Sequence, residues 1–211
     1  MGHMSNPTNT SNTEAAPLVW LDMEMTGLVT STCVPLQVAI VITDANLNEL
    51  DSIEITIWQP EEVLARMSPF VRNMHTENGL LEKVRASVCD LGQAQRELLS
   101  FVAQWCAVGT GVLAGNSIHT DRAFIKAYFP ALDAYLHYRM VDVSSFKELV
   151  YRWYGPDALA AKVTANHTAL ADIRDSIQEL KHYRDRWMLP RPSSVGTNPS
   201  SGSSSQSEST T

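Results

Sequence analysis

Three short runs rich in β-branched and other apolar residues follow one another in the N-terminal third of the chain, and no other feature restricts the possible folds as strongly. The runs cover residues 18–24, 36–43 and 53–58. Turn-forming residues, such as Thr26-Gly27 and Asp44-Ala45-Asn46, separate them. Runs of this length between turns predict three strands arranged as a β-meander.

The rest of the chain alternates between helix-like and strand-like spacing. Apolar residues recur at helical spacing over residues 91–105, and short apolar runs at 112–114 and 140–143 predict two further strands. Helices are predicted at 121–128, at 144–153 with Ser144 as N-cap, and from 170 to 187 with Asn166 available as cap. Strands first and alternating units afterwards predict an α/β or α+β domain with a mixed sheet.

Length and composition predict a single domain. A chain of 211 residues, 44% of them hydrophobic, can bury one substantial core. We expect this domain to span residues 17–189. Residues 1–16 and 190–211 are mainly small and polar, and such segments bury too little apolar surface to become ordered, so both ends are predicted to be disordered tails. The opening residues 1–4 read as a cloning remnant.

Apolar runs and cysteines restrict the compartment. No run reaches the roughly 18 to 20 apolar residues of a membrane-spanning helix, and the N-terminus lacks the basic-then-apolar order of a signal peptide. Three widely spaced cysteines without a CxxC pair indicate neither a disulfide framework nor a thiolate zinc site. We therefore expect an intracellular protein of the cytosol or the mitochondrion that does not enter membranes.

The net charge restricts the partner. The chain carries a formal charge of −7, whereas proteins that hold long nucleic acids usually neutralise many phosphates with a basic face. If the partner is a nucleic acid, we expect a short one that offers few phosphates.

Asp22 and Glu24 lie two positions apart on a predicted strand that is otherwise apolar. Residues at this spacing project from the same face of a sheet. Two carboxylates on one face repel each other unless a cation lies between them, so the pair indicates a metal site. The alternative is an edge strand on which both groups are solvated.

Three further residues join this pair as candidates. Asp121 follows a predicted strand and turn, where it could serve a functional site or cap a helix. His167 and Asp172 are five residues apart, which on a helix separates them by about 140°, so they converge only if His167 lies at or before the first turn. A cap at Asn166 would place it there. Taken alone, His167 could equally be an ordinary solvent-facing histidine.

The order of these residues is the most specific functional signal. An Asp-x-Glu pair near the start, an Asp after a mid-chain strand and a His-x4-Asp pair near the end resemble the DEDD exonucleases of the histidine type. Residues 20–28, 115–118, 137–139, 142–144 and 147–149 further resemble the oligoribonuclease branch of that superfamily. The resemblance extends from about residue 18 to about residue 187. The chain departs from the family pattern at Gln37 and Ala171, where acidic residues are usual.

The resemblance implies a ribonuclease H-like fold and a 3′→5′ exoribonuclease that hydrolyses short oligoribonucleotides, especially dinucleotides, to nucleoside 5′-monophosphates. Carboxylates are hard oxygen ligands suited to Mg²⁺ or Mn²⁺. Two such ions would be held by Asp22, Glu24, Asp121 and Asp172, and His167 would accept the proton of the attacking water.

The resemblance also implies which residues bind the substrate. Ser117, Arg139 and Ser144 match a cap over the 5′ phosphate, which Tyr138 and His75 from a partner subunit would complete. Leu28 would wedge against the bases, and Met25 is a further candidate for substrate binding. Without the family context, Arg139 reads as a surface ion-pair residue.

A homodimer is implied as well. Tyr151, Trp153 and Tyr154 are candidate interface anchors, because aromatic residues are enriched at interface cores. Ordinary core packing is the alternative for each of them.

Two other functions stay open at this point. A broader 3′→5′ exonuclease would trim longer RNA or DNA, but this would call for a basic track that the acidic chain does not show. A non-catalytic nucleic-acid-binding module is the second alternative, although such proteins commonly lose metal ligands and all five positions are present here.

Overall fold

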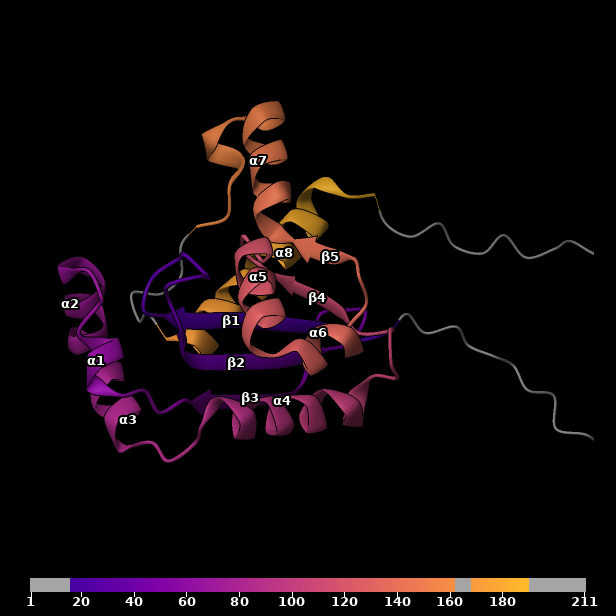
Figure 1. The fold of residues 1–211 in the computed structure, drawn as a ribbon. Coiled ribbons are helices and arrows are strands. Elements are labelled where there is room, and N and C mark those ends of the chain that lie inside the picture. The colour runs from indigo at the N-terminus through magenta and orange to yellow at the C-terminus, as the bar shows by residue number, and fades with distance from the viewer. Residues whose placement is uncertain (1–15, 162–167, 190–211) are drawn as a thin grey trace, which may run out of the picture.

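The computed structural model describes residues 16–161 and 168–189, which form a five-stranded mixed sheet with helices on both faces (Figure 1). The strand order is β3-β2-β1-β4-β5. The strands are β1 (Leu18–Met25), β2 (Pro35–Thr43), β3 (Glu49–Thr56), β4 (Val112–Gly115) and β5 (Met140–Asp142). Strands β1 to β3 are antiparallel, while β4 and β5 run parallel to β1. The predicted single domain with a mixed sheet is confirmed.

The alternation of side chains along β1 separates the two cores. Val19, Leu21 and Met23 pack into a core with α4 (Leu91–Trp105), α5 (His119–Tyr128) and α6 (Pro130–Tyr135). On the other face of β1, Trp20 packs into a second core with α7 (Val143–Tyr154) and α8 (Ala169–Trp187). Every residue of β2 is buried, because helices cover this strand on both faces.

Three short helices between β3 and α4 were not predicted from the sequence. They are α1 (Glu61–Leu64), α2 (Pro69–Glu77) and α3 (Leu80–Ala86), and they form a lobe at one end of the sheet (Figure 1). Leu64, Met67 and Leu81 belong to a small core that also includes Leu36 of β2. A proline at the start of α2 and a glycine at positive φ before α3 divide this segment into pieces too short for a clear helical period.

Both predicted helix caps are wrong. The carboxylate of Asp142, not Ser144, caps α7 by accepting a hydrogen bond from the Ser144 N–H. Thr168 caps α8 by accepting from the Ala171 N–H, whereas Asn166 lies outside the described residues. In each case the residue that precedes the first helical turn has an extended backbone and a short oxygen-bearing side chain, which is what an N-cap requires.

Strand β3 also begins four residues earlier than predicted and ends at Thr56. A short 3-10 helix, η1 (Pro156–Ala158), follows α7. The predicted tails lie outside the described residues, apart from Ala16. Among the helices of the described residues, none combines the length and apolar character that crossing a membrane would require.

Candidate active site

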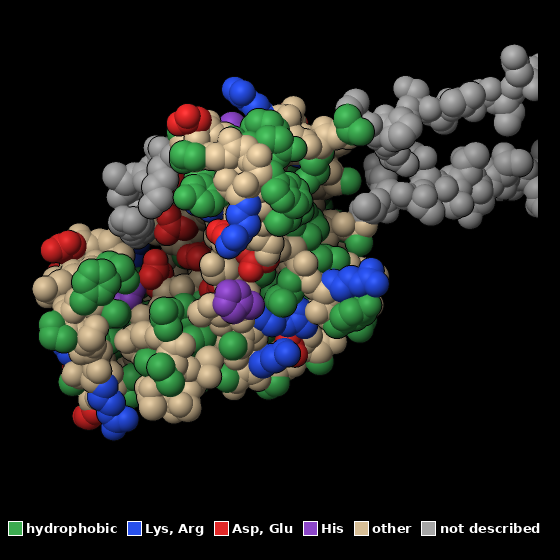
Figure 2. Space-filling view, turned by 90° about the horizontal axis from the view of Figure 1, so that it is seen from above, with side chains coloured by type: hydrophobic (Ala, Val, Ile, Leu, Met, Phe, Trp, Pro, Cys, Tyr) green, Lys and Arg blue, Asp and Glu red, His purple; other side chains and the backbone are tan. Residues whose placement is uncertain are grey.

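The C-terminal half of β1 and the first turn of α8 bring acidic side chains together. Asp22 and Glu24 share the face of β1 that α8 covers, and Asp172 lies in the first turn of α8. Each of the three offers one carboxylate oxygen, and these oxygens lie within 4.8 Å of one another. In Figure 2, acidic side chains gather in a hollow of the surface beside the α1–α3 lobe. The sequence-predicted pair on β1 and its partner on α8 therefore converge.

Asp121 lies close to this cluster but is held differently. It occupies the first turn of α5 and is buried, and its carboxylate accepts hydrogen bonds from the backbone N–H groups of Met23 and of Asp121 itself. The helix-cap alternative is wrong, because Ile118 is the N-cap of α5. His167, the predicted proton acceptor, lies outside the described residues.

Burial and the repulsion of neighbouring carboxylates raise the pKa values of Asp22 and Asp121. Burial is the largest cause for Asp22, followed by the negative charges of Asp121, Glu24 and Asp172. Burial also raises the pKa of Asp121 to about 7, against the opposing effect of its two backbone hydrogen bonds. A divalent cation among these groups would offset both the repulsion and the lost solvation. The donor set, made only of carboxylate oxygens, fits Mg²⁺ or Mn²⁺.

The departure at Gln37 leaves a neutral residue beside this cluster. Gln37 lies opposite Glu24 in the β1–β2 register and is buried. Its amide nitrogen donates to the Thr56 hydroxyl at 3.1 Å, so its side chain serves the β2–β3 pairing. A neutral, hydrogen-bonded amide adds no charge to the carboxylates on β1.

Ser117 and Ser144 are brought together after β4 and β5. The Ser117 N–H donates both to Asp142 Oδ1 and to Ser144 Oγ, each at 3.0 Å, and the two serine hydroxyls are 3.2 Å apart. Ser117 has φ +49°, a left-handed conformation that is uncommon for a residue with a side chain. Asp142, which holds both serine N–H groups, was not predicted as a site residue, although an Asp two residues before a serine is a recognisable cap pattern.

Arg139 and Tyr138 lie in the turn before β5. The guanidinium carbon of Arg139 is 5.3 Å from the centroid of the Tyr138 ring, and that ring stacks on His137. Tyr138 is 73% exposed. No ion pair of Arg139 occurs within the described part of the chain, so nothing there supports the surface ion-pair alternative.

His75 is not available to a partner subunit, which corrects that part of the prediction. Its side chain is fully buried on α2, and its Nε2 lies 2.9 Å from the Met25 carbonyl oxygen of the same chain. Its Nδ1 is 3.8 Å from Glu24 Oε2 and has no hydrogen-bond partner among the residues that the structure describes. Burial lowers the pKa of His75. The α1–α3 lobe therefore places this imidazole beside the acidic cluster of its own chain.

Leu28 and Met25 point to different surroundings. Leu28 is 73% exposed on the loop after β1, where contact with a base is possible. The side chain of Met25 is partly buried against the core on the α4 side of the sheet, which is not the side of Asp22 and Glu24. Its predicted contact with substrate stays a prediction.

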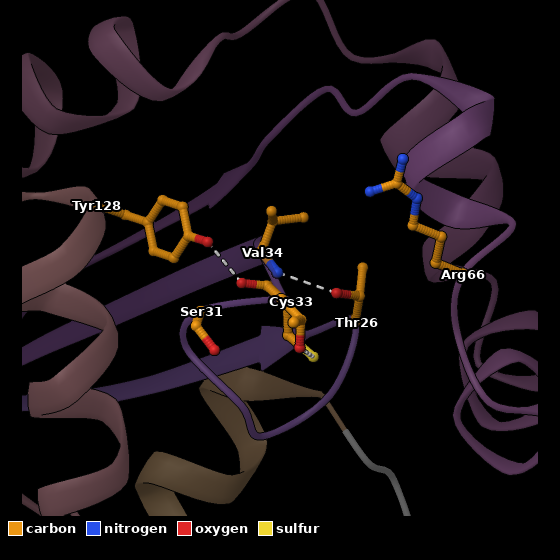
Figure 3. A pocket seen from close by; sticks show the side chains of 7 residues that line it. Thr26, Ser31, Cys33, Val34, Arg66 and Tyr128 are labelled. Atoms are coloured by element: carbon orange, nitrogen blue, oxygen red, sulfur yellow. Dashed lines mark hydrogen bonds between the residues drawn. The ribbon is translucent and has the colours of Figure 1, made fainter.

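Hydrogen bonds hold the loop that carries Leu28 in place. Thr26 and Val34 pair through backbone and side-chain hydrogen bonds, and the Tyr128 hydroxyl donates to the carbonyls of Thr30 and Cys33 at 3.2 and 2.6 Å. A pocket of about 440 Å³ lies beside this loop (Figure 3). It is lined by Thr26, Ser31, Thr32, Cys33, Val34, Arg66 and Tyr128. Sequence reasoning missed Tyr128, because a tyrosine near a helix end carries no local sign of a contact so distant in the chain.

The aromatic residues of α7 are on the surface. Tyr151, Trp153 and Tyr154 are 52%, 67% and 52% exposed, so the core-packing alternative is wrong for all three. The ring of Tyr154 stacks on Trp187 at 4.1 Å. Helix α7 itself projects beyond the sheet (Figure 1).

Comparison with known sequences finds exonucleases and oligoribonucleases. A family model described as Exonuclease matches residues 19–180. The oligoribonuclease of Corynebacterium diphtheriae is 47% identical over 184 residues, covering 83% of this chain and 85% of that protein. The oligoribonuclease of Azoarcus sp. is 42% identical over 81% of this chain and 94% of that protein.

Solved structures resemble the fold at much lower identity. E. coli exonuclease I in complex with an oligonucleotide overlays with a TM-score of 0.65 and 15% identity. The match covers 82% of this chain but only 42% of the exonuclease I chain. At this identity the likeness concerns the fold alone, and it agrees with the ribonuclease H-like sheet expected from the sequence.

Proposed function

Since the chain belongs to the oligoribonuclease family of exonucleases, we propose that it is a 3′→5′ exoribonuclease that hydrolyses short RNA fragments, especially dinucleotides, to nucleoside 5′-monophosphates. The observation that carries the proposal is the convergence of Asp22, Glu24 and Asp172, whose oxygens lie within 4.8 Å of one another. The acidic net charge of −7 agrees with a substrate that offers few phosphates.

The proposed metal site consists of Asp22, Glu24, Asp121 and Asp172, which would hold two Mg²⁺ or Mn²⁺ ions. Such ions lower the pKa of a bound water and stabilise the leaving 3′ oxygen. The protein's own contribution is to hold four carboxylates on one strand and in the first turns of two helices, so that little reorganisation is needed. We assign to His167 the acceptance of the water's proton; in the sequence it directly precedes Thr168, the cap of α8.

Recognition of the 5′ end is assigned to a phosphate cap made of Ser117, Arg139 and Ser144. The hydrogen bonds between the two serines and the lack of an ion pair for Arg139 among the described residues support this assignment. A guanidinium can bind a terminal phosphate bidentately, and a terminal phosphate carries more charge than an internal diester. Leu28 would contact the bases from the loop after β1. Any contribution of His75 would come from the same chain and not from a partner subunit.

We further propose a homodimer in which Tyr138 of one protomer reaches the cap of the other. The exposed aromatic residues of α7 support an interface there. The relatives named above are bacterial proteins, which favours action in the cytoplasm and lends no support to the mitochondrial alternative.

One gel tests the proposal. A 5′-labelled RNA dinucleotide and a longer RNA are each incubated with the protein, with and without Mn²⁺, and Asp172→Asn serves as the inactive control. We expect rapid, Mn²⁺-dependent cleavage of the dinucleotide and a loss of at least about a hundredfold in the variant. Preferential cleavage of the longer RNA would favour the broader exonuclease, and the absence of cleavage of either RNA would favour a binding module.

A further inference from the structure

A continuous chain of hydrogen bonds joins the phosphate cap to the helix that carries Asp172. Ser144 Oγ donates to Asn116 Oδ1 at 3.1 Å. Asn116 Nδ2 in turn donates to Ser176 Oγ at 2.8 Å and to Glu179 Oε2 at 3.1 Å, both on α8. Ser176 Oγ then donates to the main-chain carbonyl of Asp172 at 2.9 Å. Asn116, in the turn after β4, is the side chain that links Ser144 to helix α8.

The Glu179 carboxylate fixes the direction of the hydrogen bonds that Asn116 makes in this network. A carboxylate can only accept, so Glu179 requires the nitrogen of the Asn116 amide to face α8 and its oxygen to face Ser144. Glu179 is itself held by Lys147 and by the hydroxyl of Tyr183. The Asn116 amide therefore cannot turn over without placing its oxygen against this carboxylate.

The turn that follows Asn116 needs such an anchor. Ser117 adopts φ +49°, which costs a non-glycine residue conformational energy and persists only where the surroundings hold it. Asp142, at the end of β5, accepts a hydrogen bond from its N–H, and so does the Ser144 hydroxyl, which in turn donates to Asn116. Through Asn116, this second contact ties the cap to α8, in addition to the packing of α7 against α8.

We propose that Asn116 is a positioning residue that sets the spacing between the 5′-phosphate cap and the metal centre, and thereby selects substrates of dinucleotide length. The proposal rests on the proposed function. A dinucleotide must place its 5′ phosphate in the cap and its scissile phosphate at the acidic cluster at the same time. If the spacing is rigid, only a substrate of matching length can occupy the cap and the metal centre at the same time.

The test compares two dinucleotides that differ only in a 5′ phosphate or a 5′ hydroxyl. Asn116→Ala should lower kcat/KM for the phosphorylated dinucleotide by about tenfold or more, with kcat falling as well as KM rising, because the error lies in alignment. The 5′-hydroxyl dinucleotide, which does not use the cap, should lose less than about threefold. Ser176→Ala removes one of the two contacts of Asn116 on α8. It should lower kcat/KM for the phosphorylated dinucleotide, relative to the 5′-hydroxyl dinucleotide, by a smaller factor than Asn116→Ala does.

Asn46→Ala is the matched control, because Asn46 is exposed in the β2–β3 loop at the far end of the sheet and its side chain has no hydrogen bond among the described contacts. Thermal unfolding verifies that each variant is folded. If Asn116→Ala does not fold, the comparison of the two dinucleotides is made with Ser176→Ala instead. Equal losses for both dinucleotides, or none, would overturn the proposal while leaving the exonuclease function intact. A wild-type protein that cleaves neither dinucleotide would instead refute the proposed function itself.

Discussion

At the scale of single residues, the buried carboxyl groups of the acidic cluster decide how the protein responds to pH. A raised pKa means that the folded protein holds the Asp121 proton more tightly than the unfolded chain does. The stability from this group is therefore fully present below the ordinary carboxyl pKa and is lost as the pH rises towards about 7. Metal ions should reverse the loss, because they bind the ionised form.

Asp121→Asn should remove this part of the pH dependence. Without metal, the free energy of unfolding of the wild type should fall, relative to the variant, by about 2 kcal/mol between about pH 5.5 and 7. The comparison with the variant cancels the opposite contribution of His75, whose lowered pKa adds stability as the pH rises. Urea unfolding in EDTA at several pH values measures the difference. A pH profile that is the same in both proteins would contradict it.

Arg139 is the residue on which 5′-end recognition depends most. Arg139→Ala should weaken binding of a 5′-phosphorylated dinucleotide by about 2 to 3 kcal/mol, the scale of a lost charge-assisted contact. A 5′-hydroxyl dinucleotide should be affected much less. Calorimetry with Ca²⁺ in place of the catalytic metal compares the two, and equal losses would argue against the cap.

At the scale of elements, helix α5 serves the site at both ends. Its first turn holds Asp121, and its last residue, Tyr128, donates to two carbonyls of the loop that carries Leu28. One short helix thus fixes a proposed metal ligand and the loop that we assign to base contact. The packing of α5 against β1 keeps both ends in register with the sheet.

Tyr128→Phe should release that loop. Loss of the hydroxyl leaves two carbonyls without their donor and should cost about 1 kcal/mol of stability. The KM for a dinucleotide should rise, because Leu28 is no longer held in place, and amide hydrogen exchange in residues 27–33 should quicken.

Tyr135→Phe provides the matched control for this change. The Tyr135 hydroxyl makes a similar bond to the Cys106 carbonyl at 2.8 Å, away from the Leu28 loop. A similar loss of stability with an unchanged KM is expected there. If both variants raised KM equally, the effect of Tyr128 would be a general loss of stability and not a loosened loop.

At the scale of the whole molecule, the proposed homodimer depends on the exposed aromatic residues of α7. Tyr151 and Trp153 leave large apolar surfaces in water on a helix that projects from the domain. We expect light scattering at micromolar concentration to show a dimer of the 23.3 kDa chain. Changing both residues to alanine should shift it to a monomer and lower turnover of 5′-phosphorylated dinucleotide, because Tyr138 of the partner would be lost.

Val88→Ala is the control for that prediction, since Val88 is 92% exposed on the connection between α3 and α4. A wild-type monomer with full activity would contradict both the dimer and the assignment of Tyr138. A dimer that survives the double change would place the interface elsewhere on the surface.

The order of the five strands and of helices α4, α5, α7 and α8, the mixed sheet and the candidates Asp22, Glu24, Asp121 and Asp172 could be predicted from the chain alone. Period-two and period-3.6 spacing report which side chains share a face, and this local property needs no knowledge of neighbours. The family resemblance supplied the roles of residues such as Arg139 and Leu28, which spacing could not have assigned.

Contacts between distant segments were decided only in the folded protein. The burial of His75 beside Glu24, the bond from Tyr128 to the Leu28 loop and the bridge from Asn116 to α8 join residues far apart in the chain. The α1–α3 lobe escaped prediction for the same reason, because its short helices are stabilised by a shared core and not by their own spacing. Local pattern determines which face a side chain occupies, whereas only packing determines what that side chain meets there.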